Sequence, residues 1–130
     1  MNALVVEGSA ATRAILKRTL SEGGFAVVTA DNGSDALLLM AHQDLDLVLV
    51  QWNLPGLKGF DLLREIRRQP RYDKIKVVMM TTEANQAEVS HALAAGAQEC
   101  IMKPFTPGVV YDKLRLAGLP VPNGETIACG

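Results

Sequence analysis

The stretch from Leu45 to Gly56 constrains the fold of this chain more than any other. It reads Leu-Asp-Leu-Val-Leu-Val-Gln-Trp-Asn-Leu-Pro-Gly, so an apolar run without a polar face ends abruptly at Gln51. This pattern is typical of a strand that is buried on both faces of a parallel sheet. In an open α/β sheet the functional site lies at the carboxyl end of such strands. The residue at this end is a neutral amide, which under ordinary conditions is neither a nucleophile nor a metal ligand.

Apolar strands alternate with amphipathic helices along the rest of the chain. The apolar runs predict strands at residues 3–6, 25–30, 45–51, 75–81 and 99–102. Helical spacing predicts helices at 12–22, 60–68, 84–95 and 107–117, with another helix after the turn at 31–34. The βαβαβαβαβα order predicts an α/β fold, a doubly wound five-stranded parallel sheet with right-handed crossovers and helices on both faces.

Capping residues support several of these helices. Ser9 is a suitable N-cap for the first helix and Gly23-Gly24 a suitable end, while Thr106 and Pro107 suit the start of the last helix. Apolar spacing also predicts which side chains face the core. These are Ile15, Leu16 and Leu20 in the first helix, Phe60, Leu63 and Ile66 in the third, and Val89, Ala92 and Leu93 in the fourth.

Composition excludes several classes of function. The chain has 130 residues, a net charge of −1 and an isoelectric point near 6.1, which gives no electrostatic footprint for nucleic acid or a membrane surface. No apolar stretch approaches the ~20 residues of a membrane span, and no secretory leader is evident. We therefore expect a cytoplasmic protein with one domain at residues 1–119 and a flexible tail at 120–130. Cys100 and Cys129 lack metal-type spacing, so we expect reduced thiols in the core and in the tail.

Four stretches occur in an order and at spacings that carry a family resemblance: residues 4–9, 47–56, 78–83 and 95–105. Over residues 3–117 the chain resembles the receiver domain of bacterial two-component response regulators, close to the single-domain chemotaxis type. The resemblance implies a flavodoxin-like fold with strand order 2-1-3-4-5. It also implies a site with an acidic pair, a phosphoaccepting aspartate, a switch hydroxyl and a lysine that precedes a cis proline.

The chain departs from this family pattern at three acidic positions. Gln51 stands where the resemblance places the phosphoaccepting aspartate, Gly8 stands for the second acid of the pair, and Glu7 is a longer first acid. Thr81 and Lys103 are retained at the switch and lysine positions. Phosphoryl transfer needs a carboxylate nucleophile and Mg²⁺, so we expect phosphorylation to be lost and Mg²⁺ binding to be lost or very weak.

A competing interpretation keeps residual phosphorylation or metal affinity through Glu7 or another acid. One carboxylate and the carbonyl of Asn53 are poor competitors for hydrated Mg²⁺, which argues against it. We expect an ion pair between Glu7 and Lys103, with Gln51 filling the remaining space through hydrogen bonds. The alternative is a water-filled pocket without a direct contact.

Two further positions follow from the resemblance. The family's cis peptide maps to Lys103–Pro104. Cys100 stands where many receivers carry the aromatic switch residue. It is interpreted either as a small residue that packs under the fourth helix, or as a sign of altered coupling or redox sensitivity.

The resemblance implies a signalling protein rather than an enzyme, with protein partners such as a histidine kinase or chemotaxis proteins. The family's usual output and dimer surface maps to the fourth helix, fifth strand and fifth helix, about residues 84–117, so we expect partners, and a homodimer if one forms, on this face. A phosphate-accepting relay or sink fed by a histidine kinase is the alternative function. A small-molecule site at the strand tips ranks last, because no phosphate-cradling glycine loop is visible.

Overall fold

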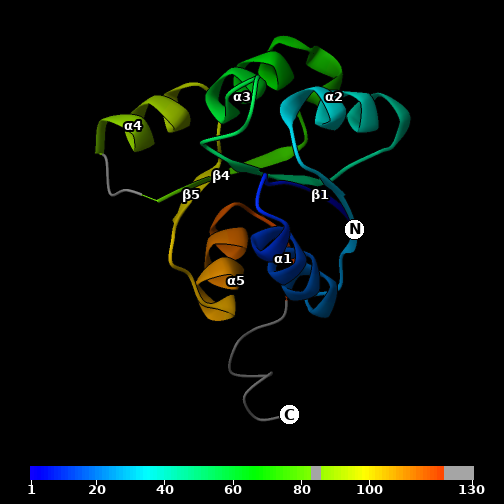
Figure 1. Cartoon of the computed structure of the whole chain (residues 1–130), viewed down its shortest axis with the longest axis vertical. Coiled ribbons are helices and arrows are strands. Elements are labelled where there is room, and N and C mark those ends of the chain that lie inside the picture. Colours follow the sequence, from blue (N-terminus) through cyan, green and yellow to red (C-terminus); the bar gives the residue numbers. More distant parts are fainter. Residues whose placement is uncertain (83–85, 122–130) are drawn as a thin grey trace.

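The fold is a five-stranded parallel sheet with helices on both faces (Figure 1). A computed structural model of the chain describes residues 1–82 and 86–121. The strands are β1 (Asn2–Val6), β2 (Ala26–Ala30), β3 (Leu47–Gln51), β4 (Lys76–Thr81) and β5 (Glu99–Met102). The helices are α1 (Ala10–Glu22), α2 (Gly33–His42), α3 (Gly59–Arg68), α4 (Gln86–Ala94) and α5 (Pro107–Leu116), with a short 3₁₀ helix η1 (Pro70–Tyr72). The strand order β2-β1-β3-β4-β5 confirms the predicted fold class.

Strand β3 lies in the centre of the sheet, and all five of its residues are buried. Its side chains alternate between two core layers. Val48 and Val50 belong to the layer that includes residues of α2, α3 and α4, whereas Leu47 and Leu49 belong to the layer under α1 and α5. Figure 1 shows α2, α3 and α4 on one side of the sheet and α1 and α5 on the other. Burial on both faces explains why this strand reads as an unbroken apolar run.

The predicted caps are present. The Ser9 hydroxyl accepts a hydrogen bond from the Thr12 amide at 3.3 Å, and the Thr106 hydroxyl accepts one from the Val109 amide at 3.2 Å. Gly24, just after α1, has a φ of +98°, which a residue with a side chain rarely adopts. Local sequence chemistry therefore sets where α1 and α5 begin and where α1 ends.

The prediction that Ile15 and Leu93 face the core was wrong. Ile15 is 54% exposed and Leu93 is 45% exposed. In α1 the buried row is Leu16, Thr19 and Leu20, so Ile15 lies one residue, about 100° of helical rotation, away from it. In α4 the small residue Ala92 is the buried one among the described residues, which leaves Leu93 turned toward solvent.

Packing continues slightly beyond the predicted domain boundary at residue 119. Leu119 and Val121 are buried in the same layer as Phe25. The rest of the predicted tail, residues 122–130 with Cys129, lies outside the described residues, as does the predicted start of the fourth helix at residue 84. Within the described ranges, no helix has the length and apolar character that a membrane span requires.

Arg67 connects α3 to the segment between α4 and β5. Its half-buried guanidinium donates hydrogen bonds to the carbonyl oxygens of Gly96, Tyr72 and Ile75 at 2.9, 3.0 and 2.7 Å. It also donates to the Gln98 side-chain oxygen at 2.8 Å. Because one planar guanidinium donates hydrogen bonds to four acceptors, Arg67 fixes the turn after α4 against α3 and the start of β4.

Candidate functional site

The predicted site residues meet at the carboxyl edge of the sheet. Glu7 follows β1, Gln51 ends β3, Thr81 ends β4 and Lys103 follows β5, and these four strands are consecutive neighbours in the sheet. Three of the four side chains are almost inaccessible, with exposures of 3% for Glu7, 5% for Gln51 and 7% for Thr81. The fourth, Lys103, has a side-chain exposure of 17%, and the predicted site residue Asn53 is exposed in the loop after β3.

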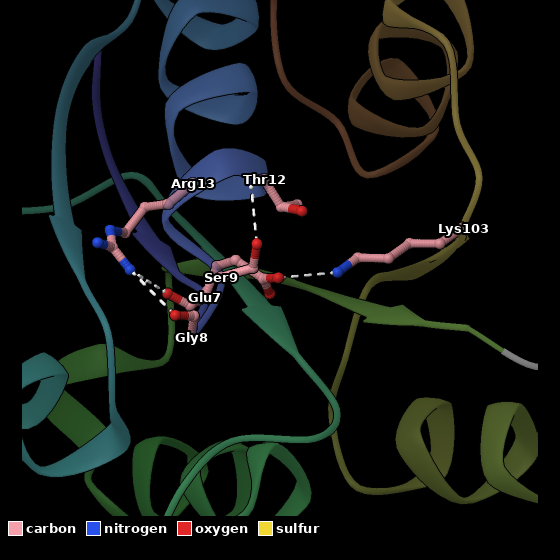
Figure 2. A network of polar contacts seen from close by, with 6 residues as sticks. All are labelled: Glu7, Gly8, Ser9, Thr12, Arg13 and Lys103. Carbon is pink, nitrogen blue, oxygen red and sulfur yellow. Dashed lines mark hydrogen bonds and ion pairs between the residues drawn. The ribbon is translucent and has the colours of Figure 1, made fainter.

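Glu7 and Lys103 form a buried ion pair (Figure 2). The Lys103 ammonium donates to Oε1 of Glu7 at 2.9 Å, and the exposed fractions of the two side chains are 17% and 4%. The predicted contact is therefore confirmed. A charge-assisted hydrogen bond of this kind compensates for the removal of both groups from water.

Backbone contacts hold both partners in place. The Lys103 amide donates to the Thr81 carbonyl oxygen at 2.8 Å, which fixes the start of the segment after β5 beside the end of β4. The peptide bond between Lys103 and Pro104 is cis. On the other side of the pair, the Glu7 amide donates to the Ala30 carbonyl oxygen at 3.0 Å.

Arg13 is a site residue that the sequence reasoning missed. Its Nη1 donates to the carbonyl oxygen of Glu7 at 2.8 Å and to that of Gly8 at 3.4 Å, so it fixes the turn between β1 and α1 (Figure 2). Helical side chains point back toward the helix N-terminus. A long basic residue in the first turns of α1 was therefore the available signal.

Gln51 does not make the hydrogen bond expected of its amide oxygen. Within the described residues, neither Oε1 of Gln51 nor Oε2 of Glu7 has a hydrogen-bond partner, although both atoms are buried. The prediction that Gln51 completes the pocket by hydrogen bonding is therefore wrong for this oxygen. The ion pair satisfies only one of the two carboxylate oxygens of Glu7.

Two glycines shape the rim in different ways. A Cβ on Gly59 would lie 2.2 Å from the Gln51 carbonyl oxygen, so only glycine permits α3 to begin this close to β3. A Cβ on Gly8 would lie no closer than 3.5 Å to its nearest neighbour, the Pro55 Cδ. Packing around this Cβ therefore does not exclude a side chain at position 8.

The residues at this edge do not fit the Mg²⁺ that the fold family implies. Mg²⁺ requires octahedral oxygen coordination with charge supplied by carboxylates. Glu7 is the one carboxylate at the tips of β1 and β3, and the Lys103 ammonium already occupies its Oε1. Over residues 1–82 and 86–121, no group of three His, Cys, Asp or Glu side chains is placed to hold a metal ion.

Cys100 lies half-buried on β5 beside a hollow between α4 and α5. The hollow has a volume of about 320 Å³, and Val89, Met102 and Val109 contribute apolar walls. Burial raises the pKa of the Cys100 thiol, the Glu99 carboxylate raises it further, and Lys113 opposes both. A thiol that stays protonated is a poor nucleophile, which favours the packing interpretation of Cys100.

Comparison with known proteins identifies the family. Residues 3–115 match the response regulator receiver domain, and the chain belongs to this family. It is 41% identical over 118 residues to the chemotaxis protein CheY1 of Helicobacter pylori, an alignment that covers 89% of this chain and 95% of that protein. It is 35% identical over 115 residues to the chemotaxis protein CheY of Pseudomonas aeruginosa, covering 88% and 93%.

Solved structures show the same fold. The chemotaxis response regulator CheY4 of Vibrio cholerae superposes with a TM-score of 0.84 at 28% identity, covering 89% of this chain and 97% of that one. The receiver domain of the sensor histidine kinase PA1611 of Pseudomonas aeruginosa superposes with a TM-score of 0.80 at 26% identity, covering 91% and 98%. That structure holds a magnesium ion in its active site cleft.

Proposed function

We propose that this chain is an atypical receiver that acts in two-component signalling by binding proteins, without being phosphorylated. Its membership of the receiver family and its similarity to chemotaxis proteins support a chemotaxis-like pathway. In this proposal it is a cytoplasmic binding protein and not an enzyme.

The observation that carries the proposal is the chemistry at the end of β3. The phosphoacceptor of this family is an aspartate, and the resemblance places it at Gln51, whose amide cannot form an acyl phosphate. The neighbouring Lys103 is bound to Glu7 at 2.9 Å. The cation that stabilises a phosphoryl group in an ordinary receiver is therefore already neutralised.

The missing carboxylates argue in the same direction. The PA1611 receiver domain coordinates magnesium in its cleft. Here Gly8 contributes no side chain and Gln51 no charge, which leaves Glu7 as the one acid of this set. Without the metal, the phosphoryl oxygens would have no divalent counter-charge during transfer.

The partner surface in this proposal is the face formed by α4, β5 and α5. Met102 and Val109, which line the hollow beside Cys100, are 48% and 40% exposed, and Leu93 on α4 is 45% exposed. Exposed apolar side chains around a hollow are typical of a site that receives an anchor residue from a partner. We expect a histidine kinase or a chemotaxis protein here, or a second copy of the chain.

The direct test is phosphorylation with acetyl phosphate and MgCl₂, read by intact-protein mass spectrometry. We expect no phosphoryl adduct on the wild-type chain. The matched positive control is the double variant Gly8→Asp, Gln51→Asp, which restores both acids and is permitted by the space around Gly8. Labelling of the wild-type chain would establish the alternative, a phosphate-accepting relay or sink.

A further inference from the structure

Two buried acceptor atoms at the site require a donor that the described residues do not provide. Oε2 of Glu7 and Oε1 of Gln51 have no partner among the described residues, and both side chains are at least nine-tenths buried. Folded proteins rarely leave such atoms unsatisfied, because each one forfeits its hydrogen bonds to water. A ligand that donates hydrogen bonds would remove this cost.

The two side chains extend from the same register level of adjacent strands. Val6 and Val50 are paired in the register of β1 and β3, so Glu7 and Gln51 occupy the next position on each of two adjacent strands. Successive side chains of a strand alternate between faces, and residues paired in register share a face.

Charge decides which kind of donor fits. Lys103 already neutralises Glu7, and the Arg13 guanidinium is bound to the Glu7 and Gly8 carbonyl oxygens. A metal ion would therefore add positive charge beside two existing cations, in a pocket that offers one neutralised carboxylate. A neutral molecule with two donor hydrogens satisfies both oxygens without adding charge.

We propose that an internal water molecule bridges Oε2 of Glu7 and Oε1 of Gln51. The inference stands on the two unsatisfied oxygens, and it does not require the proposed absence of phosphorylation to be correct. In this proposal the water molecule occupies the pocket whether or not divalent cations are present.

High-resolution crystal structures of the full chain, grown in excess MgCl₂ and again in EDTA, test the proposal directly. We expect an ordered water within hydrogen-bond distance of both oxygens in each crystal. A metal ion on Glu7 in the MgCl₂ crystals would overturn the proposal, and so would a direct contact of the Gln51 amide nitrogen with Glu7 without water. Phosphorylation is measured separately by mass spectrometry, so the two proposals can fail independently.

A solution measurement uses matched variants. In the wild-type chain, nuclear Overhauser cross-peaks from a long-lived water should reach the backbone amides of Glu7 and Gln51. Gln51→Met keeps the length of the side chain but removes the amide, so these cross-peaks should be lost. Gln43→Met, at an exposed glutamine, should leave them unchanged. Absence of the cross-peaks from the wild-type spectrum would refute the bridging water.

Discussion

The buried ion pair makes Lys103→Met the most informative single substitution. Methionine preserves much of the length of the side chain but removes the charge, so Glu7 is left buried at 4% side-chain exposure without its cation. Removing one partner of a buried pair costs about 3–5 kcal/mol. We expect the lower end of this range, because the Lys103 side chain keeps 17% of its exposure.

This cost corresponds to a large change in melting temperature. An unfolding entropy of about 2.1 cal/mol/K per residue, applied to 130 residues, converts 3 kcal/mol into a decrease of about 11 °C in Tm. The assay is urea denaturation followed by circular dichroism, with a thermal melt as the second measurement. The double variant Glu7→Gln, Lys103→Met should be more stable than Lys103→Met, because it contains no uncompensated charge.

An exposed ion pair of the same chain provides the control. Arg18 and Glu22 are 3.0 Å apart, but their side chains are 83% and 60% exposed. Arg18→Met should therefore change stability by less than about 1 kcal/mol. If Lys103→Met is no more destabilising than Arg18→Met, Lys103 does not offset the cost of burying the Glu7 carboxylate.

Three further predictions concern packing and the thiol. Arg67→Met should cost about 2–4 kcal/mol and accelerate amide hydrogen exchange in the turn after α4, because four acceptors each lose one hydrogen bond; unchanged exchange there would contradict its connecting role. Gly59→Ala should destabilise the fold by about 1–3 kcal/mol in urea, since its Cβ would clash with the Gln51 carbonyl oxygen; a neutral effect would show that α3 shifts freely. In a Cys129→Ser background, Cys100 should react with iodoacetamide more slowly than free cysteine at neutral pH. Its raised pKa keeps the thiol protonated to higher pH, so the rate should climb only under more alkaline conditions, and a rate equal to that of free cysteine would be the opposite result.

The sequence predicted those features that depend on local chemistry. The apolar run of β3 and the cap at Ser9 specify their own structure, because burial on both faces and a hydroxyl before a helix act over a few residues. The contact between Glu7 and Lys103 was also predictable, since a single acid remained to face the lysine.

The features that the sequence did not predict depend on tertiary contacts. Ile15 and Leu93 are exposed because the rotation of each helix about its axis is set by the partners it packs against, and apolar spacing alone allows several phases. Arg13 was a visible basic residue at the start of α1, but its acceptors are backbone carbonyl oxygens, which no residue type marks in the sequence. The unsatisfied Gln51 oxygen depends on how two strands place their side chains relative to each other, which no local pattern encodes.

The ion pair between Glu7 and Lys103 joins residues that the ribosome adds at different stages of translation. Glu7 and Lys103 are separated by 96 positions, which at bacterial rates of synthesis is roughly 5–20 s of translation. Throughout that interval the nascent chain carries an acid whose counter-charge has not yet been added. A ribosome-bound chain that stops short of Lys103 should therefore be unable to close this edge of the sheet.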